Sequence, residues 1–146
     1  MTPTRAPIDT ELASRLRLAV MRLARRLRQQ TQDPVTPSQI SALSVLERHG
    51  PITLGELAAF ERVQPPTMTR IIAALEEDGL VVREVDAADR RVARVSVSGA
   101  GRRLLDRSRS RKTAYLAARM RNLTEDERAV VERALPLLER LVGEEE

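Results

Sequence analysis

The sequence contains no cysteine and no tryptophan, and only one phenylalanine and one tyrosine occur among its 146 residues. Without cysteine there is no disulfide framework, no thiolate metal site and no thiol redox switch. With so few aromatic rings the chain also lacks the stacking surface on which many proteins bind single-stranded DNA or RNA. Thiol chemistry is therefore excluded, and binding of unpaired bases is disfavoured.

Catalytic motifs are missing as well. The only histidine, His49, precedes Gly50-Pro51, a position typical of a helix C-terminus rather than of a general base. The stretch Gly99-Ala100-Gly101 lacks the third glycine and the lysine of known phosphate-binding loops. The His, Asp and Glu residues show no metal-ligand spacing. We therefore expect no enzyme, no catalytic residue, no metal site and no cofactor.

Long apolar runs are also absent. No stretch approaches the roughly 18 apolar residues that a membrane-spanning helix needs. Met1 to Pro7 lacks the apolar core of a secretory signal, so we expect a cytoplasmic protein. Hydrophobic residues make up 42% of the chain and charged residues 32%, which suits a soluble fold with one well-formed core.

The net charge of +4 is unevenly distributed. Residues 62–112 hold twelve Arg or Lys against seven Asp or Glu, whereas residues 122–146 hold three against eight. A basic middle beside an acidic end fits a DNA-binding face next to a separate assembly segment. Charge alone would also fit an ordinary solvated surface, so the interpretation depends on the predicted elements.

Apolar residues at spacings of three and four predict six helices. Capping boxes at Thr36–Gln39, Thr53–Glu56 and Thr124–Glu127 predict three of the helix starts. The helices are expected over 10–30, 37–49, 54–60, 65–78, 99–122 and from 125 onward. The first and last are amphipathic, with an apolar face formed by Leu12, Leu16, Val20, Leu23 and Leu27 in the first, and by Val130, Val131, Leu135, Leu138 and Leu141 on the inner side of the last.

Two β-rich runs, Leu80–Val85 and Val92–Val97, predict a two-stranded hairpin whose tip is Asp86-Ala87-Ala88-Asp89-Arg90-Arg91. Two helices joined by a tight turn and followed by a basic hairpin form the outline of a winged helix-turn-helix, which reads duplex DNA. The predicted fold class is mainly α with a small β-hairpin, in which about six helices combine a winged helix-turn-helix with a helical dimerisation region.

Several motifs carry a family resemblance. They are the run Pro65-Pro66-Thr67-Met68-Thr69-Arg70-Ile71-Ile72, the segment from Leu75 to Val81, the D-x-x-D-R-R pattern of the hairpin tip, and Val95-Ser96-Val97-Ser98 with Gly101. On these motifs the chain resembles the MarR family of bacterial transcription regulators over essentially its whole length. One departure is Gln64, where the family more often has a small capping residue such as serine.

The resemblance implies a single domain over 1–146 that acts as a homodimer. Its winged helix-turn-helix would cover 36–111, and its dimerisation region would cover 8–35 and 112–146. The surplus apolar surface of the terminal helices agrees, although those helices could instead cover the core of a monomer. Two winged modules about one helical turn of DNA apart would match a pseudo-palindromic operator in double-stranded DNA.

The N-terminal turns of a recognition helix enter the major groove. Gln64 and Arg70 can read adenine and guanine edges, whereas Thr67 and Thr69 can bond phosphate or touch a thymine methyl group. Arg70 has two alternatives, a phosphate contact or a salt bridge with Glu76 or Glu77. The predicted major-groove residues are Gln64, Pro66, Thr67, Thr69 and Arg70.

At the hairpin tip an arginine can insert into a narrow minor groove. Asp86 and Asp89 would repel phosphate, so we expect them to hold the turn and to pin one arginine. The resemblance favours Arg90 as the minor-groove residue, but the sequence alone does not separate it from Arg91. Weaker candidates for phosphate contacts are Ser38 and Arg62.

The resemblance further implies a repressor that a small, often phenolic or anionic molecule releases from DNA. A crevice for it would be lined by Leu18, Met21, His49, Phe60 and Tyr115, residues that core packing explains equally well. One alternative function is an architectural protein that binds DNA without a specific operator or a ligand switch. A protein–protein module built on the same fold is another, but it would not need the arginines at the tip.

Overall fold

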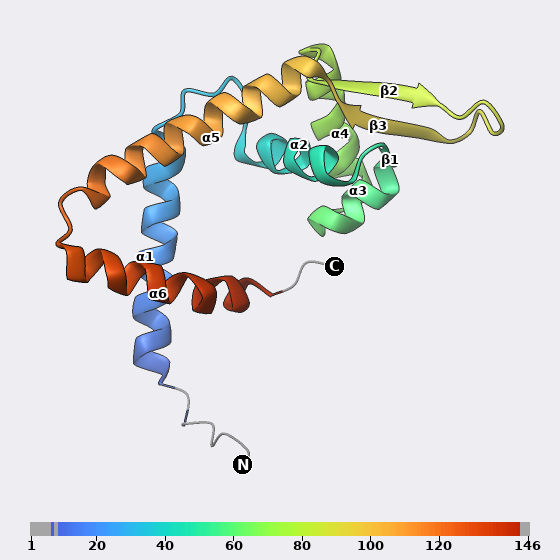
Figure 1. Ribbon diagram of the computed structural model, residues 1–146. Coiled ribbons are helices and arrows are strands. Elements are labelled where there is room, and N and C mark those ends of the chain that lie inside the picture. Colours follow the sequence, from blue (N-terminus) through green and yellow to red (C-terminus); the bar gives the residue numbers. More distant parts are fainter. Residues whose placement is uncertain (1–6, 8, 144–146) are drawn as a thin grey trace.

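The computed structural model describes residue 7 and residues 9–143, which form six helices and three strands (Figure 1). In chain order these are α1 (Thr10–Gln29), α2 (Pro37–His49), β1 (Ile52–Thr53), α3 (Leu54–Glu61), α4 (Pro65–Glu77), β2 (Val81–Val85), β3 (Ala93–Val97), α5 (Gly99–Met120) and α6 (Glu125–Val142). The predicted fold class, mainly helical with a small β element, is confirmed.

Side-chain caps fix where several helices begin. The Asp9 carboxylate accepts hydrogen bonds from two amides in the first turn of α1. The reciprocal boxes Thr36–Gln39 and Thr124–Glu127 are both formed at the starts of α2 and α6. Because each cap satisfies amides that have no partner within the helix, each stabilises the fold by about 1 kcal/mol.

The sheet contains a third strand, so the predicted two-stranded hairpin was incomplete. Its order is β1-β3-β2, all antiparallel, with Ile52 of β1 opposite Val95 of β3. Strand β1 has two residues, too few to show an alternating pattern. The capping box predicted at Thr53 forms only in part. The Glu56 amide donates to Thr53 Oγ1 as expected. The Glu56 carboxylate, however, accepts from the Thr53 hydroxyl instead of from the Thr53 amide.

The end of α4 and the base of the hairpin share one backbone junction. Gly79 is in the left-handed region (φ 71°), and the amides of Gly79 and Leu80 bond the carbonyls of Glu76 and Leu75. The Leu80 amide is thus used by the helix end, and β2 begins at Val81 rather than at Leu80 as predicted. The Ser98 amide then bonds the Leu80 carbonyl at 3.0 Å, and its hydroxyl bonds the Gly79 carbonyl at 2.7 Å.

The hydrophobic core lies among α2, α3, α4, the sheet and the first half of α5. Fully burying one aliphatic side chain contributes about 1.5–3 kcal/mol, so this core holds the winged module together. Its largest buried members are Leu43, Leu46, Leu57, Met68, Ile72, Leu75, Val95 and Leu105.

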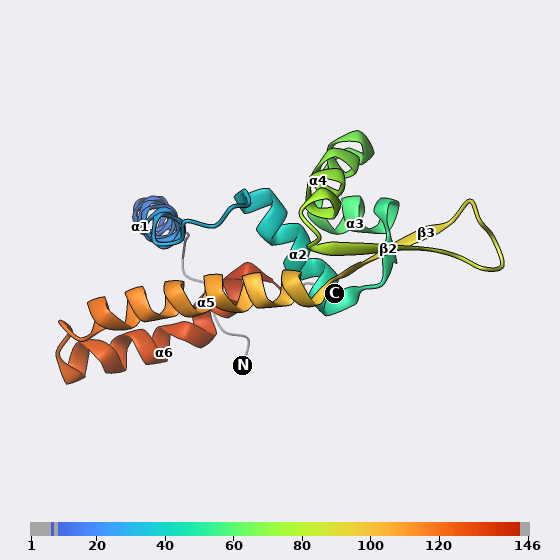
Figure 2. The same cartoon turned by 90° about the horizontal axis from the view of Figure 1, so that it is seen from above.

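By contrast, α1 and α6 contain no buried residue. The two helices cross in Figure 1, but the view from above in Figure 2 shows that they lie apart. Val130, Leu135 and Leu141, which the sequence placed on the inner side of the last helix, are 56%, 47% and 71% exposed. The alternative that these helices cover the core of a monomer is therefore wrong, because neither helix contributes a residue to the core and much of each apolar face is exposed in the single chain.

Close packing at Gly101 and open space at Gly55 predict different effects for the two glycine substitutions. A Cβ at Gly101 would collide with the backbone oxygen of Leu80 and come within 2.7 Å of Val97 Cγ2, whereas one at Gly55 would meet nothing closer than 3.9 Å. We expect Gly101→Ala to destabilise the fold by about 1–3 kcal/mol in urea denaturation. Gly55→Ala, the matched control, should be neutral or stabilising by up to about 1 kcal/mol. Equal unfolding midpoints for both variants would contradict this close packing.

Candidate DNA-binding surface

Helix α4 turns one face to the core and the other to solvent. Met68 and Ile72 are fully buried beneath the helix. Gln64, Pro66 and Arg70 are exposed on the opposite side, in the cap position and the first two turns. The predicted recognition residues therefore lie on an accessible face of a helix that the core holds firmly.

The polar side chains on this face differ in whether they already have a hydrogen-bond partner within the protein. Gln64 occupies the cap position of α4, but its side chain makes no capping bond, so its amide remains available. The exposed Thr69 side chain donates its hydroxyl proton to the Pro65 carbonyl at 3.0 Å, so that proton is already committed. Thr67 is half-buried at the start of the helix. Thr69 is thus better suited to touching a thymine methyl group than to donating a hydrogen bond to phosphate.

The Arg70 side chain forms no hydrogen bond or ion pair with the described residues. Glu76, one of the two acids considered as its partner, binds Arg83 of β2 instead, with Arg83 Nε 3.0 Å from Glu76 Oε1. Glu77 is exposed and is not paired with Arg70 either. The alternative in which Arg70 is held in an intramolecular salt bridge is therefore wrong, and its guanidinium is free to meet a ligand.

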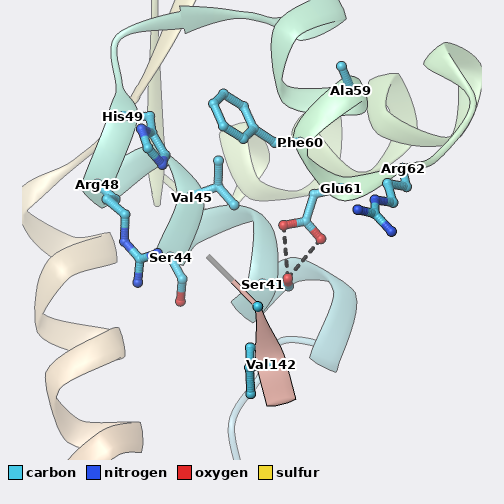
Figure 3. Close-up of a pocket in the computed structure, with 11 residues that line it drawn as sticks. Ser41, Ser44, Val45, Arg48, His49, Ala59, Phe60, Glu61, Arg62 and Val142 are labelled. Atoms are coloured by element: carbon cyan, nitrogen blue, oxygen red, sulfur yellow. Dashed lines mark hydrogen bonds between the residues drawn. The ribbon is translucent and has the colours of Figure 1, made fainter. Parts of the chain in front are cut away.

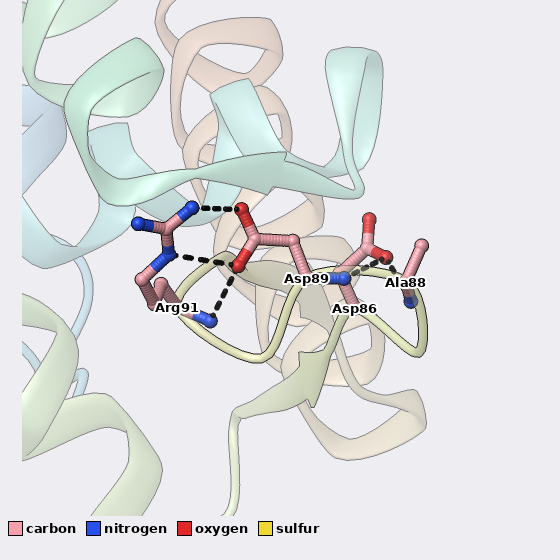
Figure 4. A network of polar contacts seen from close by, with 4 residues as sticks. All are labelled: Asp86, Ala88, Asp89 and Arg91. Carbon is pink, nitrogen blue, oxygen red and sulfur yellow. Dashed lines mark hydrogen bonds and ion pairs between the residues drawn. The ribbon is translucent and has the colours of Figure 1, made fainter.

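A network of carboxylates shapes the tip of the hairpin (Figure 4). Asp86 accepts hydrogen bonds from the amides of Ala88 at 2.7 Å and Asp89 at 3.2 Å, and Arg94 Nη1 lies 2.7 Å from its second oxygen. Asp89 accepts from the Arg91 amide at 3.1 Å and from the Arg91 guanidinium at 3.1 and 3.2 Å. Both acids are thus engaged within the wing.

These contacts keep the two acids ionised. The hydrogen bond from Arg94 lowers the pKa of Asp86 below its ordinary value, and the amides of Ala88 and Asp89 lower it further. The pKa of Asp89 is lowered by the side chain and then the amide of Arg91. Because both folded-state pKa values are depressed, these bonds favour the ordered wing at neutral pH and are lost only as pH falls through those values.

The two tip arginines are not equivalent. The Arg91 side chain is 91% exposed, yet both its guanidinium and its amide are bonded to Asp89. Arg90 is exposed and has no hydrogen-bond or ion-pair partner among the described residues. The geometry therefore distinguishes a held arginine from a free one, which the sequence alone did not.

The two weaker phosphate candidates lie on separate helices. Ser38 is exposed in the first turn of α2, and Arg62 is exposed at the end of α3. Arg62 adopts the left-handed conformation (φ 52°, ψ 43°), which is uncommon for a side chain with a Cβ. Next to it, the Glu61 carboxylate accepts from the Ser41 hydroxyl, whose oxygen lies 2.9 and 2.7 Å from the two carboxylate oxygens. This contact joins α2 to α3.

A cavity of about 760 Å³ opens between α2, α3 and the end of α6 (Figure 3). The rings of His49 and Phe60 stack in it with centroids 4.5 Å apart. Its polar rim was not foreseen from the sequence, because it combines residues from three separate segments. The lining residues are Ser41, Ser44, Val45, Arg48, His49, Ala59, Phe60, Glu61, Arg62, Val142 and Gly143.

Only two of the five predicted crevice residues, His49 and Phe60, line this cavity. Leu18 and Met21 lie on α1 and are 40% and 58% exposed. Tyr115 lies on α5, with the Arg119 guanidinium 5.3 Å from its ring centroid. The alternative that these residues form core is wrong for the single chain, since Phe60 is also 42% exposed and His49 is exposed.

Other kinds of site find no support in the described part of the chain. Residues 7 and 9–143 contain no group of three or more His, Asp or Glu side chains that could hold a metal ion. Within the same range, no helix is both long and apolar enough to cross a membrane.

A helix-turn-helix with an exposed polar face, followed by an arginine-tipped hairpin, defines a winged helix-turn-helix transcription regulator. The sequence profile of the MarR family matches residues 35–93. An uncharacterised HTH-type transcriptional regulator of Mycobacterium leprae is 45% identical over 137 residues, covering 93% of this chain and 96% of that protein. The chain belongs to the MarR family of transcription regulators, as its motifs predicted.

Two solved structures are similar to the whole fold. A putative transcriptional regulator from Pseudomonas aeruginosa is 40% identical, with a TM-score of 0.86 over 95% of this chain and 100% of that one. A MarR family protein from Bacillus stearothermophilus is 29% identical, with a TM-score of 0.78 over 92% and 95%. The similarity therefore extends beyond the matched segment to the terminal helices.

Proposed function

We propose that this chain is a sequence-specific repressor that binds duplex DNA as a homodimer and is released by a small molecule. The observation that carries the proposal is the pairing of a free recognition face, with Gln64 and Arg70 unengaged, and a free Arg90 at the wing tip. Repression is supported by a relative, the HTH-type transcriptional repressor MdtR of Bacillus subtilis, which is 31% identical over 93 residues.

In this proposal each element contacts a different part of the duplex. The first turns of α4 enter the major groove, where Gln64 and Arg70 hydrogen-bond base edges. Arg90 enters the adjacent minor groove, while Asp89 holds Arg91 near the backbone. Ser38 and Arg62 contact phosphates on either side, which positions the module without reading sequence.

Dimerisation is proposed from the open faces of α1 and α6. Both helices expose apolar side chains, and their charges are complementary: α1 has six Arg and one Glu, whereas α6 has five acids and three Arg. A second copy would cover these faces and set two winged modules about one turn of DNA apart. We therefore assign residues 8–35 and 112–146 to dimerisation and 36–111 to DNA binding.

Sedimentation tests this assembly. We expect a particle of twice the 16.3 kDa chain mass at micromolar concentration. Val130→Asp, which places a charge on the open face of α6, should shift the particle to the single-chain mass because a buried unpaired charge is costly. A wild-type particle of 16.3 kDa would contradict the homodimer.

DNA titrations test the recognition residues. Footprinting the intergenic DNA beside the gene defines the operator, and binding is then compared with random duplex at one fixed salt concentration. We expect the wild-type protein to prefer the operator by about a thousandfold or more. Arg90→Ala should lower operator affinity by about fivefold or more, since good charged contacts are worth about 1–3 kcal/mol.

Arg91→Ala is the matched control, because it removes the same charge one residue away. We expect it to cost less than Arg90→Ala, and equal losses would show that Arg90 has no special role. A similar affinity for operator and random DNA would instead favour the architectural alternative. Arg70→Ala in the same titrations should weaken operator binding selectively, whereas equal losses on both duplexes would assign Arg70 to phosphate.

The cavity beside the recognition module supports the release step. It adjoins α3, which leads directly into α4, and combines the stacked His49 and Phe60 rings with the cationic Arg62. Such a lining suits a small molecule with a flat apolar body and a negative charge. A ligand there would change operator affinity only if it bound the free and DNA-bound shapes unequally.

Salicylate, a phenolic anion, is a suitable probe of release. We expect it to lower the operator affinity of the wild type by about tenfold, within the usual range of coupling between two sites. Phe60→Ala should abolish the response while binding DNA as before, because it removes one ring of the stack. Tyr115→Phe, outside the cavity, is the control and should respond normally. An unchanged wild-type affinity would contradict release by this class of molecule.

A further inference from the structure

The ion pair between Glu76 and Arg83 joins the recognition helix to the wing. Glu76 lies in the last turn of α4, and Arg83 is the middle residue of β2. Arg83 Nε and Nη2 lie 3.0 and 2.5 Å from the same carboxylate oxygen, Glu76 Oε1. Two donors on one acceptor restrict the orientation of both side chains more than a single contact would.

The other ion pairs of the described residues act elsewhere. Those of Asp86 with Arg94 and of Asp89 with Arg91 lie within the hairpin, and Arg109 with Glu47 joins α5 to α2. Within the described range, the Glu76–Arg83 pair is thus the salt bridge that connects α4 to the sheet. The pair lies beside the backbone junction at Leu80. It adds a side-chain link between α4 and the hairpin at the point where the chain passes from one to the other.

The hairpin needs such a link because its far end is unsupported. In both Figure 1 and Figure 2 it extends away from the helices, and four of the five β2 residues are exposed. The tip lies on the order of 15 Å beyond Arg83, at about 3.3 Å per residue along a strand. A swing of about 10° at the base would therefore move the tip by roughly 2–3 Å, enough to take Arg90 out of hydrogen-bonding range of its target.

Arg83 is itself anchored in the rigid part of the sheet. Its backbone pairs with Val95, which is completely buried in the centre of β3. The side chains of Arg83 and Glu76 are 36% and 33% exposed. A pair this exposed contributes little to global stability, so its effect on geometry can be separated from any effect on folding.

From these observations we propose that Glu76 and Arg83 are positioning residues that fix the wing relative to the recognition helix, so that both grooves are contacted in one register. The proposal rests on the proposed DNA-binding function but concerns a property of the free protein. Neither residue needs to touch DNA. Their role is to hold Arg90 at a set distance from Arg70.

The absence of cysteine allows the geometry to be measured directly. Ala73→Cys on α4 and Ala88→Cys at the wing tip replace exposed residues and give unique sites for nitroxide labels. Labelled chain diluted with unlabelled chain isolates the distance within one protomer. We expect a narrow distance distribution in the parent protein, a broader one after Arg83→Met, and a narrow one again in the exchanged pair Glu76→Arg with Arg83→Glu. Arg111→Met, which removes an exposed arginine from α5, should leave the distribution unchanged.

The same variants are then compared on the operator with and without Arg90→Ala. Arg83→Met should weaken binding by about five- to tenfold and should reduce the effect of Arg90→Ala, because contacts that depend on one another are not additive. Protection of the DNA backbone under the wing from hydroxyl radicals should fade. Protection of major-groove guanines from methylation should persist. The exchanged pair should restore protection under the wing, and thermal midpoints should stay close to the parent value.

Each result separates the inference from the function on which it rests. An unchanged label distribution in Arg83→Met overturns the inference, whatever the DNA result. The same holds if Arg90→Ala has an equal effect in both backgrounds, which would make Arg83 an independent phosphate contact. A wild-type protein without operator preference would instead refute sequence-specific binding, and the label distances would still decide whether the pair fixes the wing.

Discussion

The arrangement of this protein depends on the close contact of Gly101 with the backbone of Leu80. At that point the end of α4, the start of β2 and the start of α5 meet in space. The Leu80 carbonyl accepts a hydrogen bond from the Ser98 amide. The left-handed conformation of Gly79 lets α4 end and β2 begin without a longer loop. The recognition helix, the wing and the long helix are consequently positioned by one backbone junction.

Much of the fold could be predicted because its boundaries are set locally. Thr36 with Gln39, and Thr124 with Glu127, show their roles within four residues of sequence. Strand β1 could not be predicted, since Ile52 becomes a strand residue only by pairing with Val95, more than forty residues later. The partial cap at Thr53 has the same cause, as its backbone is shared between that strand and α3.

The candidate site was predictable in outline but not in its contacts. Residue types and helical period place Gln64 and Arg70 on the exposed face of α4. By contrast, the distinction between Arg90 and Arg91 depends on which side chain Asp89 reaches, and sequence order does not encode that choice. Of the predicted crevice residues, only His49 and Phe60 line the cavity, because the chain brings the end of α6, rather than α1 and α5, to α2 and α3.

Helix α5 gives the molecule a mechanical property as well as a connection. Its 22 residues form one uninterrupted rod, about 33 Å long at 1.5 Å per residue. One end is fixed to the base of the wing, and the other leads into α6. A tilt of about 10° about its far end would displace the wing base by roughly 6 Å, which exceeds the rise of one base pair, about 3.4 Å. In the proposed homodimer, the spacing between the two DNA-binding modules would thus be set by an angle, and a small rotation among the terminal helices would be amplified into a mismatch with the proposed operator.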